Sequence, residues 1–153
     1  MNSVKIDLSK KMGKIKPMNC VNNGPTGSKV RKTKGNFEYY QALNIPYARL
    51  HDASFYSGYG GEYSVDVHRV FPNFDADEND PKSYLFQPTD IYLQDIESVG
   101  TKIFYRLGAS LEHGYKKGTY PPKDYNKWAR ICEHIIRHYT EGWADGFKMD
   151  IEY

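Results

Sequence analysis

The stretch Thr101-Lys-Ile-Phe-Tyr-Arg-Leu-Gly-Ala-Ser-Leu-Glu-His113 decides the predicted fold. Apolar residues alternate along its first half, between two glycines, which is typical of a short β-strand over residues 101–107. Arg106 in this strand needs a carboxylate partner from a neighbouring strand, because an unpaired buried charge is costly. Glu112 and His113 follow the strand, at the end where α/β proteins bind their ligands.

A second stretch, Ile45-Pro-Tyr-Ala-Arg-Leu-His-Asp52, has the same design: an apolar strand that carries an arginine and ends in a histidine and an acid. In an extended segment Arg49 and His51 share one face. We expect both residues, together with Asp52, to line a pocket; a histidine that is hydrogen-bonded near the core is the alternative. Two strands that deliver polar groups in one direction indicate a parallel sheet with a functional face.

Composition narrows the class of protein. The 153 residues suffice for one domain, and 39% of them are apolar, which allows a core. A net charge of only +2 argues against a nucleic-acid partner held by phosphate contacts. No apolar run approaches the ~18 residues of a membrane span. The 14 tyrosines can stack on sugars or fill half-buried surfaces, and the sequence leaves both readings open.

The N-terminus and the cysteines bear on the cellular compartment. Residues 1–11 lack the apolar core of a signal peptide, so we expect a cytoplasmic chain or one that has lost an upstream export signal. Cys20 and Cys132 lie far apart in apolar surroundings and form neither a disulfide framework nor a zinc spacing. We therefore predict that both cysteines are buried free thiols and that the chain binds no metal or other cofactor.

The N-terminal third is predicted to hold two strands before the first helix. Residues 4–8 alternate in polarity, and residues 15–21 form a candidate first strand that Pro17 weakens. Asn19 and Asn22, near its end, carry amide groups that can bind hydroxyls. An asparagine that stabilises a turn is an equally good interpretation of either residue.

A strand–helix–strand unit follows. Asn36 can cap a helix over residues 37–43, with Tyr40 and Leu43 on its apolar face, and the strand 47–50 comes next. The unit has the size of a βαβ motif.

The rest of the chain alternates between helix and strand around one long excursion. Residues 53–88 hold many aromatic residues and no convincing helix, so we expect an ordered excursion over the carboxyl face of the sheet. Thr89 and Asp90 should cap a helix over residues 91–99. The longest helix should begin after Asp124 and run to about Thr140, with an apolar stripe formed by Tyr125, Trp128, Cys132, Ile135 and Tyr139. Residues 147–153 look like the start of another strand, in an α/β pattern cut in mid-period.

Two polar clusters are predicted to carry no metal. The acidic run 75–80 has Asp80 where the EF-hand glycine belongs, so a solvated acidic loop is favoured over a calcium site. His134 and His138 stand four residues apart on a helix, but the zinc-protease pattern is absent and a surface pair is the better interpretation. The chain contains no phosphate-binding glycine loop, no nucleophile elbow and no complete catalytic set.

Four motifs together resemble the N-terminal part of clan A glycoside hydrolases, nearest to family thirty-nine with its β-xylosidase and α-L-iduronidase relatives. The motifs are Tyr47-Ala-Arg-Leu-His-Asp52, Val70-Phe-Pro-Asn-Phe-Asp-Ala-Asp77, Tyr105-Arg-Leu-Gly108 and Leu111-Glu-His113. The resemblance extends over nearly the whole chain from about Ile15, and the Arg-x-His on the second strand carries most weight.

The resemblance implies a (β/α)8 barrel and a retaining mechanism on O-glycosidic bonds. Residues 1–153 would be one N-terminal segment of that barrel, with strands one to three and the start of strand four. The family's acid/base glutamate lies in an Asn-Glu-Pro motif at the end of strand four and its nucleophile at the end of strand seven, so we expect both beyond this chain. No residue here is assigned as catalytic, Glu112 and Glu152 included. The substrate-binding candidates are His51, Arg49, Asp52, Asn19, Asn22, Arg106, Glu112 and His113.

The sequence leaves two other functional interpretations open. A non-enzymatic carbohydrate-binding or interaction module would use the aromatic-rich stretch 55–86. Alternatively, a separate chain supplies the rest of the barrel as a partner. For the segment alone we predict a carbohydrate ligand, no nucleic-acid or membrane partner, and no glycosidase activity, because without both glutamates nothing protonates the leaving oxygen or attacks the sugar.

Overall fold

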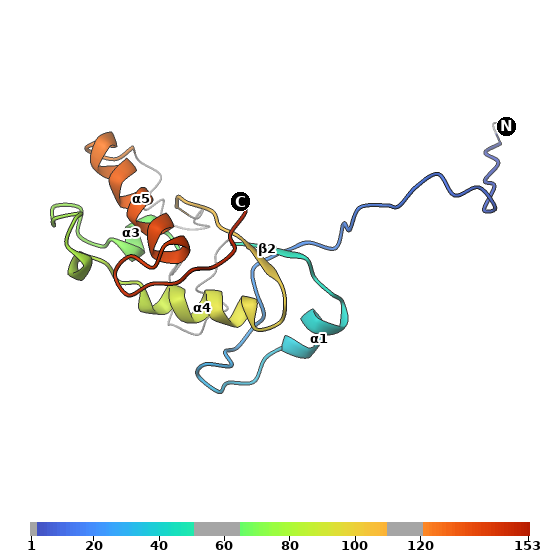
Figure 1. Cartoon of the computed structure of the whole chain (residues 1–153), viewed down its shortest axis with the longest axis horizontal. Coiled ribbons are helices and arrows are strands. Elements are labelled where there is room, and N and C mark those ends of the chain that lie inside the picture. The colour runs from blue at the N-terminus through green and yellow to red at the C-terminus, as the bar shows by residue number, and fades with distance from the viewer. Residues whose placement is uncertain (1–2, 51–64, 110–120) are drawn as a thin grey trace.

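The computed structural model describes residues 3–50, 65–109 and 121–153, which form a mixed α/β structure (Figure 1). Its three-stranded sheet has the order β1-β2-β3, and both pairs of strands are parallel, as the sequence predicted. The strands are β1 (Val21–Asn22), β2 (Tyr47–Arg49) and β3 (Lys102–Phe104). The helices are α1 (Phe37–Ala42), α3 (Val67–Val70), α4 (Gln87–Glu97) and α5 (Tyr125–Thr140), with a 3-10 turn η1 (Pro81–Ser83).

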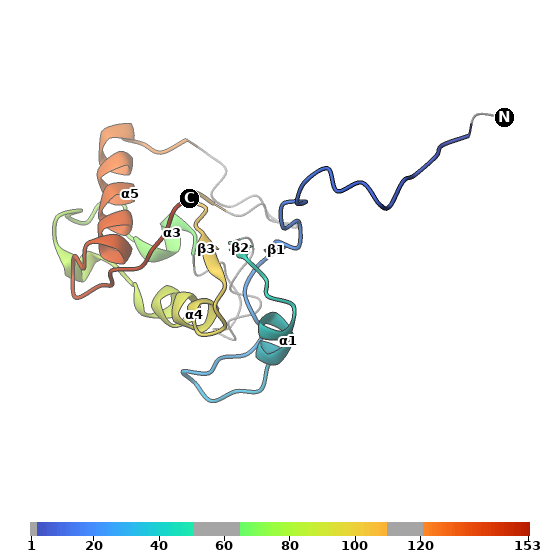
Figure 2. The ribbon, with the colours of Figure 1, turned by 45° about the vertical axis from the view of Figure 1, so that its right-hand side comes forward.

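The two faces of the sheet differ. Val21, Ala48 and Ile103 pair across the three strands, and Ala48 and Ile103 are buried in the main core. Because side chains alternate along a strand, their neighbours in sequence point to the opposite face. α4 packs against β3 and α1 lies near β1, as Figure 2 shows. Helices α1 and α4 thus cover the apolar face of the sheet.

The N-terminal segment departs from the prediction. Residues 3–20 are exposed and lead away from the α/β body without a strand (Figure 1). Both predicted strands there, 4–8 and 15–21, are therefore wrong, except that β1 begins at Val21. Alternating polarity predicts a strand only where another strand offers hydrogen bonds, and none of the described segments lies beside residues 4–8.

Helix α1 confirms the predicted position but not its details. Asn36 makes no capping bond; its Oδ1 accepts hydrogen bonds from the backbone N (2.7 Å) and Oγ1 (3.1 Å) of Thr26, which fixes the preceding loop. Tyr40 is buried as expected, whereas Leu43 is 63% exposed. The helix ends at Ala42, and Asn44 turns the chain toward β2 with a φ of +46°.

The described part of the excursion 53–88, residues 65–88, contains α3 and η1, so the expectation of no helix is wrong for this part. Its aromatic side chains belong to the main core, where the rings of Phe71 and Tyr84 pack at a tilt with their centroids 4.8 Å apart. Helix α4 begins at Gln87, four residues before the predicted start. Asp90 is consequently a residue of its first turn and not part of a cap.

The C-terminal segment runs beside β3. The backbone N of Tyr105 donates to the carbonyl of Tyr153 (2.9 Å), and Lys102 Nζ contacts Asp150 Oδ2 (3.1 Å). The two contacts advance together along both segments, so the chain from 147 to 153 lies parallel to β3. The predicted fourth strand is wrong, because residues 147–153 do not form the hydrogen bonds of a β-strand. The segment nevertheless lies beside β3, where a fourth strand of the sheet would lie.

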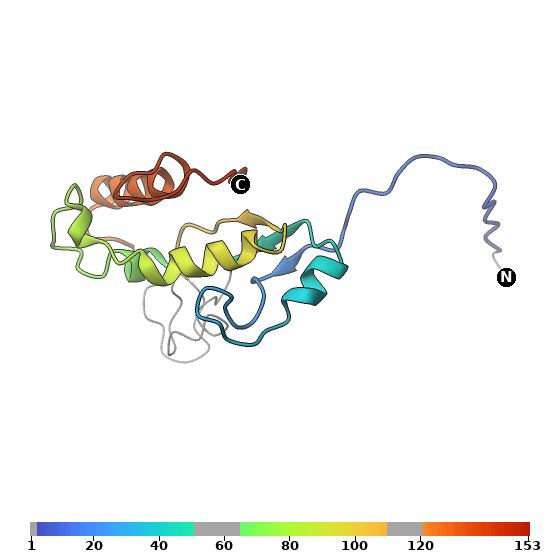
Figure 3. The same ribbon diagram turned by 60° about the horizontal axis from the view of Figure 1, so that its bottom comes forward.

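Helix α5 has the predicted length, and the Asp124 side chain caps it by accepting from the backbone N of Asn126 at 2.8 Å. The buried stripe is rotated from the predicted one: Tyr125 is 69% exposed, whereas His134 and His138 are buried. The predicted surface pair of histidines is therefore wrong. Figure 3 shows α5 and the C-terminal segment on the side of the sheet away from α1.

The cysteines and the membrane question complete the description. Cys20 is exposed, which corrects the predicted burial of its thiol, and Cys132 is half-buried against the main core. Burial raises the pKa of the Cys132 thiol. Within the residues that the structure describes, no helix is both long and apolar enough to cross a membrane.

Candidate functional site

The last residues of the three strands form one row at the carboxyl edge of the sheet. Asn22 pairs with Arg49, and Arg49 pairs with Phe104. All three side chains lie on the face opposite the buried row, because they alternate with Val21, Ala48 and Ile103 along the strands. Asn22 is exposed, Arg49 is half-buried and Phe104 is 41% exposed. The row thus combines an amide, a guanidinium and an aromatic ring.

A second row lies two residues earlier on the same face, where Tyr47 pairs with Lys102. The Tyr47 hydroxyl donates to Glu152 Oε2 (2.8 Å), and this hydrogen bond raises the pKa of Tyr47. The bond from Lys102 to Asp150 raises the pKa of Lys102. Both acids of the C-terminal segment are therefore engaged with cationic or hydroxyl groups of the sheet.

The two rows and the C-terminal segment enclose a shallow hollow, which we call the strand-end hollow. It is lined by Cys20, Val21, Asn22, Tyr47, Arg49, Phe104 and Tyr153. The Tyr153 ring lies 5.9 Å from the Tyr47 ring and 5.8 Å from the Phe104 ring. Aromatic faces together with amide and guanidinium donors suit a polyhydroxylated ligand such as a sugar. Among the described residues, no carboxyl side chain lines the hollow.

Arg106 occupies a different place, beyond the end of β3. Its guanidinium pairs with the fully buried Asp66 (2.8 Å) and donates to the carbonyls of Leu50 (3.3 Å) and Ala109. The sequence predicted a carboxylate partner, and the structure supplies one from the residue just before α3 and not from a strand. Arg106 therefore ties together the ends of β2 and β3 and the start of α3.

The structure brings together two of the substrate-binding candidates, Asn22 and Arg49, in the strand-end hollow. Asn19 lies elsewhere: its amide donates to the carbonyls of Leu43 (2.9 Å) and Asn44 (3.4 Å). The remaining four candidates lie outside the described residues; they are His51, Asp52, Glu112 and His113.

Sequence reasoning missed the aromatic residues of the hollow and the acid that pairs with Arg106. The alternation along 101–107 puts the side chains of Phe104 and Ile103 on opposite faces of the strand. This pattern could have predicted that the Phe104 ring lies on the same face as Arg49. No comparable signal exists for Asp66, because it pairs with a residue 40 positions away.

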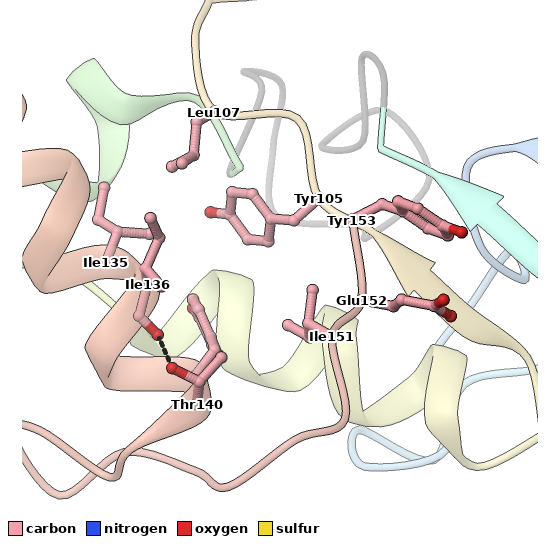
Figure 4. Close-up of a pocket in the computed structure, with 9 residues that line it drawn as sticks. Tyr105, Leu107, Ile135, Ile136, Thr140, Ile151, Glu152 and Tyr153 are labelled. Atoms are coloured by element: carbon pink, nitrogen blue, oxygen red, sulfur yellow. Dashed lines mark hydrogen bonds between the residues drawn. The ribbon is translucent and has the colours of Figure 1, made fainter.

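A second hollow, of about 200 Å³, lies between α5 and the C-terminal segment. Figure 4 shows the Tyr105 ring pointing into it toward α5, with Ile135 and Ile136 on the helix and Ile151 opposite. Burial raises the pKa of Tyr105, and its hydroxyl donates to the carbonyl of Val65 (3.3 Å). The lining is mainly apolar, and the hydroxyls of Tyr105, Tyr139 and Thr140 already donate to acceptors within the protein.

The other polar clusters hold the fold together. Among the described residues, no group of three His, Cys, Asp or Glu side chains could bind a metal ion. In the acidic run 75–80, Glu78 contacts Arg130 (2.6 Å) and Lys127 (3.4 Å) of α5. A hydrogen bond from its own backbone amide, followed by the contact with Arg130, lowers the pKa of Glu78 to about 2.

Comparison with protein-family models found no match, and comparison with curated proteins found none. Among solved structures, the chain is similar to a glucosidase from Croceicoccus marinus, with a TM-score of 0.69 and 22% sequence identity. The similarity covers 94% of this chain and 29% of the glucosidase chain, so this chain spans less than a third of that protein. The mixed α/β fold with its parallel sheet is thus similar to part of a glucosidase.

Proposed function

We propose that the chain is the N-terminal portion of a (β/α)8 glycoside hydrolase. Its three strands and the segment 147–153 would be barrel strands one to three and the start of strand four, and residues 1–153 would be one segment of a single domain. The face that carries Arg49 would then point into the barrel. The complete enzyme would cleave O-glycosidic bonds of oligo- or polysaccharides with retention, as the resemblance to family thirty-nine implies.

The observation that carries this proposal is the row Asn22–Arg49–Phe104. Three parallel strands end in register, with polar and aromatic side chains on the face opposite the buried row. In barrels and other α/β folds, ligands bind at the carboxyl ends of the strands. The fold similarity to part of a glucosidase makes a sugar the favoured ligand for this edge.

In this proposal the described residues bind and orient the sugar. The guanidinium of Arg49 and the amide of Asn22 would donate to hydroxyls, and the rings of Phe104 and Tyr153 would contact an apolar sugar face. The candidates His51, Asp52, Glu112 and His113 would extend the same site from the neighbouring strand exits. Both catalytic glutamates would come from later strands, so this segment binds without hydrolysing.

An NMR titration of the ¹⁵N-labelled chain with p-nitrophenyl β-glucoside and p-nitrophenyl β-xyloside tests the proposal. We expect the amide signals of Asn22, Arg49 and Phe104 to shift, and no nitrophenol to be released. Arg49→Ala should abolish the shifts, whereas the control Arg137→Ala on α5 should leave them unchanged. Absence of shifts at the strand ends, or measurable nitrophenol release, would contradict the proposal.

The non-enzymatic module loses part of its basis. In the described part of the aromatic-rich stretch, the rings of Phe71, Tyr84 and Phe86 are between 3% and 9% exposed and are packed in the core. Rings in the core cannot stack on a ligand, so they do not form a binding platform. Completion of the barrel by a separate chain stays a proposal that is compatible with the same hollow.

A further inference from the structure

Residues 3–18 form an exposed segment, which we call the N-terminal arm. It leads away from the α/β body in Figures 1, 2 and 3, and it contains no helix or strand. Four of its large apolar side chains are at least 88% exposed; they are Val4, Leu8, Met12 and Ile15. Single apolar side chains are common on protein surfaces, whereas a series as dense as this one indicates an interaction site.

The arm is also strongly cationic. Five of the chain's 21 lysines and arginines lie in it, against one of the 19 acidic residues, so its net charge is +4 although that of the whole chain is only +2. Asp7, the single acid, accepts a hydrogen bond from the hydroxyl of Ser9 (2.6 Å). The five lysines are exposed, and none forms an ion pair with a described residue; they are Lys5, Lys10, Lys11, Lys14 and Lys16. The near-neutral total therefore combines a cationic arm with a body of net negative charge.

An α-helix would gather the apolar side chains of the arm on one face. The four residues 4, 8, 12 and 15 follow one another at intervals of four, four and three, which is the spacing of a single stripe along a helix. Between residues 4 and 16, only Ile6 among the large apolar residues falls on the other side. Pro17 ends the pattern, because proline is not accommodated in the interior of a helix.

The lysines would surround this apolar stripe. Lys11 lies at one border of the stripe, and Lys5 and Lys16 lie at the other. Lys10 and Lys14 face away from it. Lysines at such a border cover apolar surface with their stems while their charged ends reach polar groups. An apolar stripe within a lysine-rich helix is typical of helices that lie in the interface of a lipid bilayer.

In water such a helix is not stable by itself, which agrees with its absence from the structure. Isolated helices shorter than ~12–15 residues are marginal even for alanine-rich sequences. Gly13, which has a φ of +146° in the arm, weakens the helix further because glycine loses more conformational freedom than any other residue. The helix therefore requires a surface that takes up its apolar stripe.

We propose that the N-terminal arm binds the surface of an anionic lipid bilayer, where residues 4–16 fold into an amphipathic helix. The lysines would contact the headgroups, and the apolar stripe would enter the boundary between headgroups and acyl chains. The expectation of no membrane partner rested on the absence of an apolar span, and a helix that lies in the interface needs no span. The proposal does not depend on the glycosidase function, because residues 4–16 do not line the strand-end hollow.

Other anionic partners fit the arm less well. Phosphate contacts and base stacking hold single-stranded nucleic acids, but residues 1–20 contain no Phe, Tyr or Trp on which a base could stack. A polysaccharide would leave the apolar stripe in water. An acidic protein would need a groove that matches the stripe, whereas a bilayer accepts it without a matched shape.

Co-sedimentation of the full chain with lipid vesicles tests the proposal. At about 0.1 M salt the chain should pellet with vesicles that contain roughly one-third phosphatidylserine in phosphatidylcholine, and at least about tenfold more weakly with phosphatidylcholine alone. Circular dichroism should show a gain of helical signal with the anionic vesicles only. No pelleting with the anionic vesicles, equal pelleting with both kinds, or binding without a gain of helix would overturn the proposal.

Paired substitutions separate the contribution of charge. Lys11→Gln combined with Lys16→Gln should weaken binding about 30-fold, because each lysine near an anionic surface contributes about fivefold. The matched control is Lys123→Gln combined with Lys148→Gln, which removes two exposed lysines of the body and should leave binding unchanged. Equal losses in the two double variants would contradict binding through the arm.

A second pair tests the apolar stripe. Leu8→Gln combined with Met12→Gln keeps the charge of the arm and should weaken binding at least about tenfold, because the stripe no longer enters the bilayer. The control is Leu43→Gln combined with Leu85→Gln, on two leucines of the body that are 63% and 53% exposed, and it should bind like the wild type. If the Leu8 and Met12 variant also binds like the wild type, the contact is purely electrostatic and the proposal is refuted.

Discussion

Replacing Arg106 should destabilise the fold more than replacing any exposed arginine. Arg106→Met keeps most of the side-chain stem but removes the guanidinium from the fully buried carboxylate of Asp66 and from the carbonyls of Leu50 and Ala109. Removing one partner of a buried pair typically costs about 3–5 kcal/mol, because the other charge stays in a low-dielectric site. We therefore expect a loss of about 3–5 kcal/mol, a large part of the 5–15 kcal/mol typical of a domain.

Urea unfolding followed by circular dichroism measures this loss. Arg106→Lys should recover part of it, because a lysine keeps the charge but lacks the planar fork. Arg137→Ala is the control: its partners Glu133 and Glu141 are exposed, and such pairs contribute about 0.5 kcal/mol or less. If Arg106→Met costs no more than Arg137→Ala, Arg106 does not tie the strand ends together and the reasoning is refuted.

Three further predictions follow from the same structure. Glu78→Gln should lower the free energy of unfolding at pH 7. Because the pKa of Glu78 is lowered from 4.5 to about 2, the stability difference between the wild type and the variant should shrink as the pH falls from 4.5 toward 2. Equal acid unfolding curves for the two proteins would contradict this. Cys20 should react with a thiol reagent in the folded chain while Cys132 reacts only on unfolding, as mass spectrometry of the labelled peptides can show. Gly146→Ala should lower stability by about 1–3 kcal/mol through overlap with His138, and an unchanged urea midpoint would refute that packing.

The strands and helices that could be predicted are those whose local pattern matches their surroundings. β2, β3 and α5 were located because periodicity and punctuation agree with burial in the structure. The segment 4–8 has an equally good strand pattern but does not form a strand. The prediction failed because the local sequence does not show whether a neighbouring strand is available for hydrogen bonding. The parallel sheet could be predicted because the two strands β2 and β3 are each followed by polar residues, which indicated that they run in the same direction.

The helix α5 shows where periodicity fails. The apolar pattern placed Tyr125 inward and His134 and His138 outward, yet both histidines are buried. Their hydrogen-bond partners, Tyr84 and Asp90, come from segments 50 and 48 residues away. A buried histidine is stable only with such partners, which a single sequence does not reveal.

The candidate site was predictable only in part. The strand exits pointed to Arg49 and Asn22, and the register of the sheet places both in one row. Asn19 was assigned to the same site because the first strand was predicted to begin at residue 15, whereas β1 begins at Val21. Arg106 was predicted to need a carboxylate partner and was also named a substrate-binding candidate; its guanidinium binds Asp66 and backbone carbonyls.

The most direct test of the proposed barrel is the coding sequence that follows the codon for Tyr153. If the chain is the first part of a retaining glycoside hydrolase, the sequence should continue the strand begun at 147–153 and reach an Asn-Glu-Pro motif within a few residues, followed by further strand–helix repeats. A stop codon directly after Tyr153, with no partner chain that supplies the missing strands, would contradict the proposal.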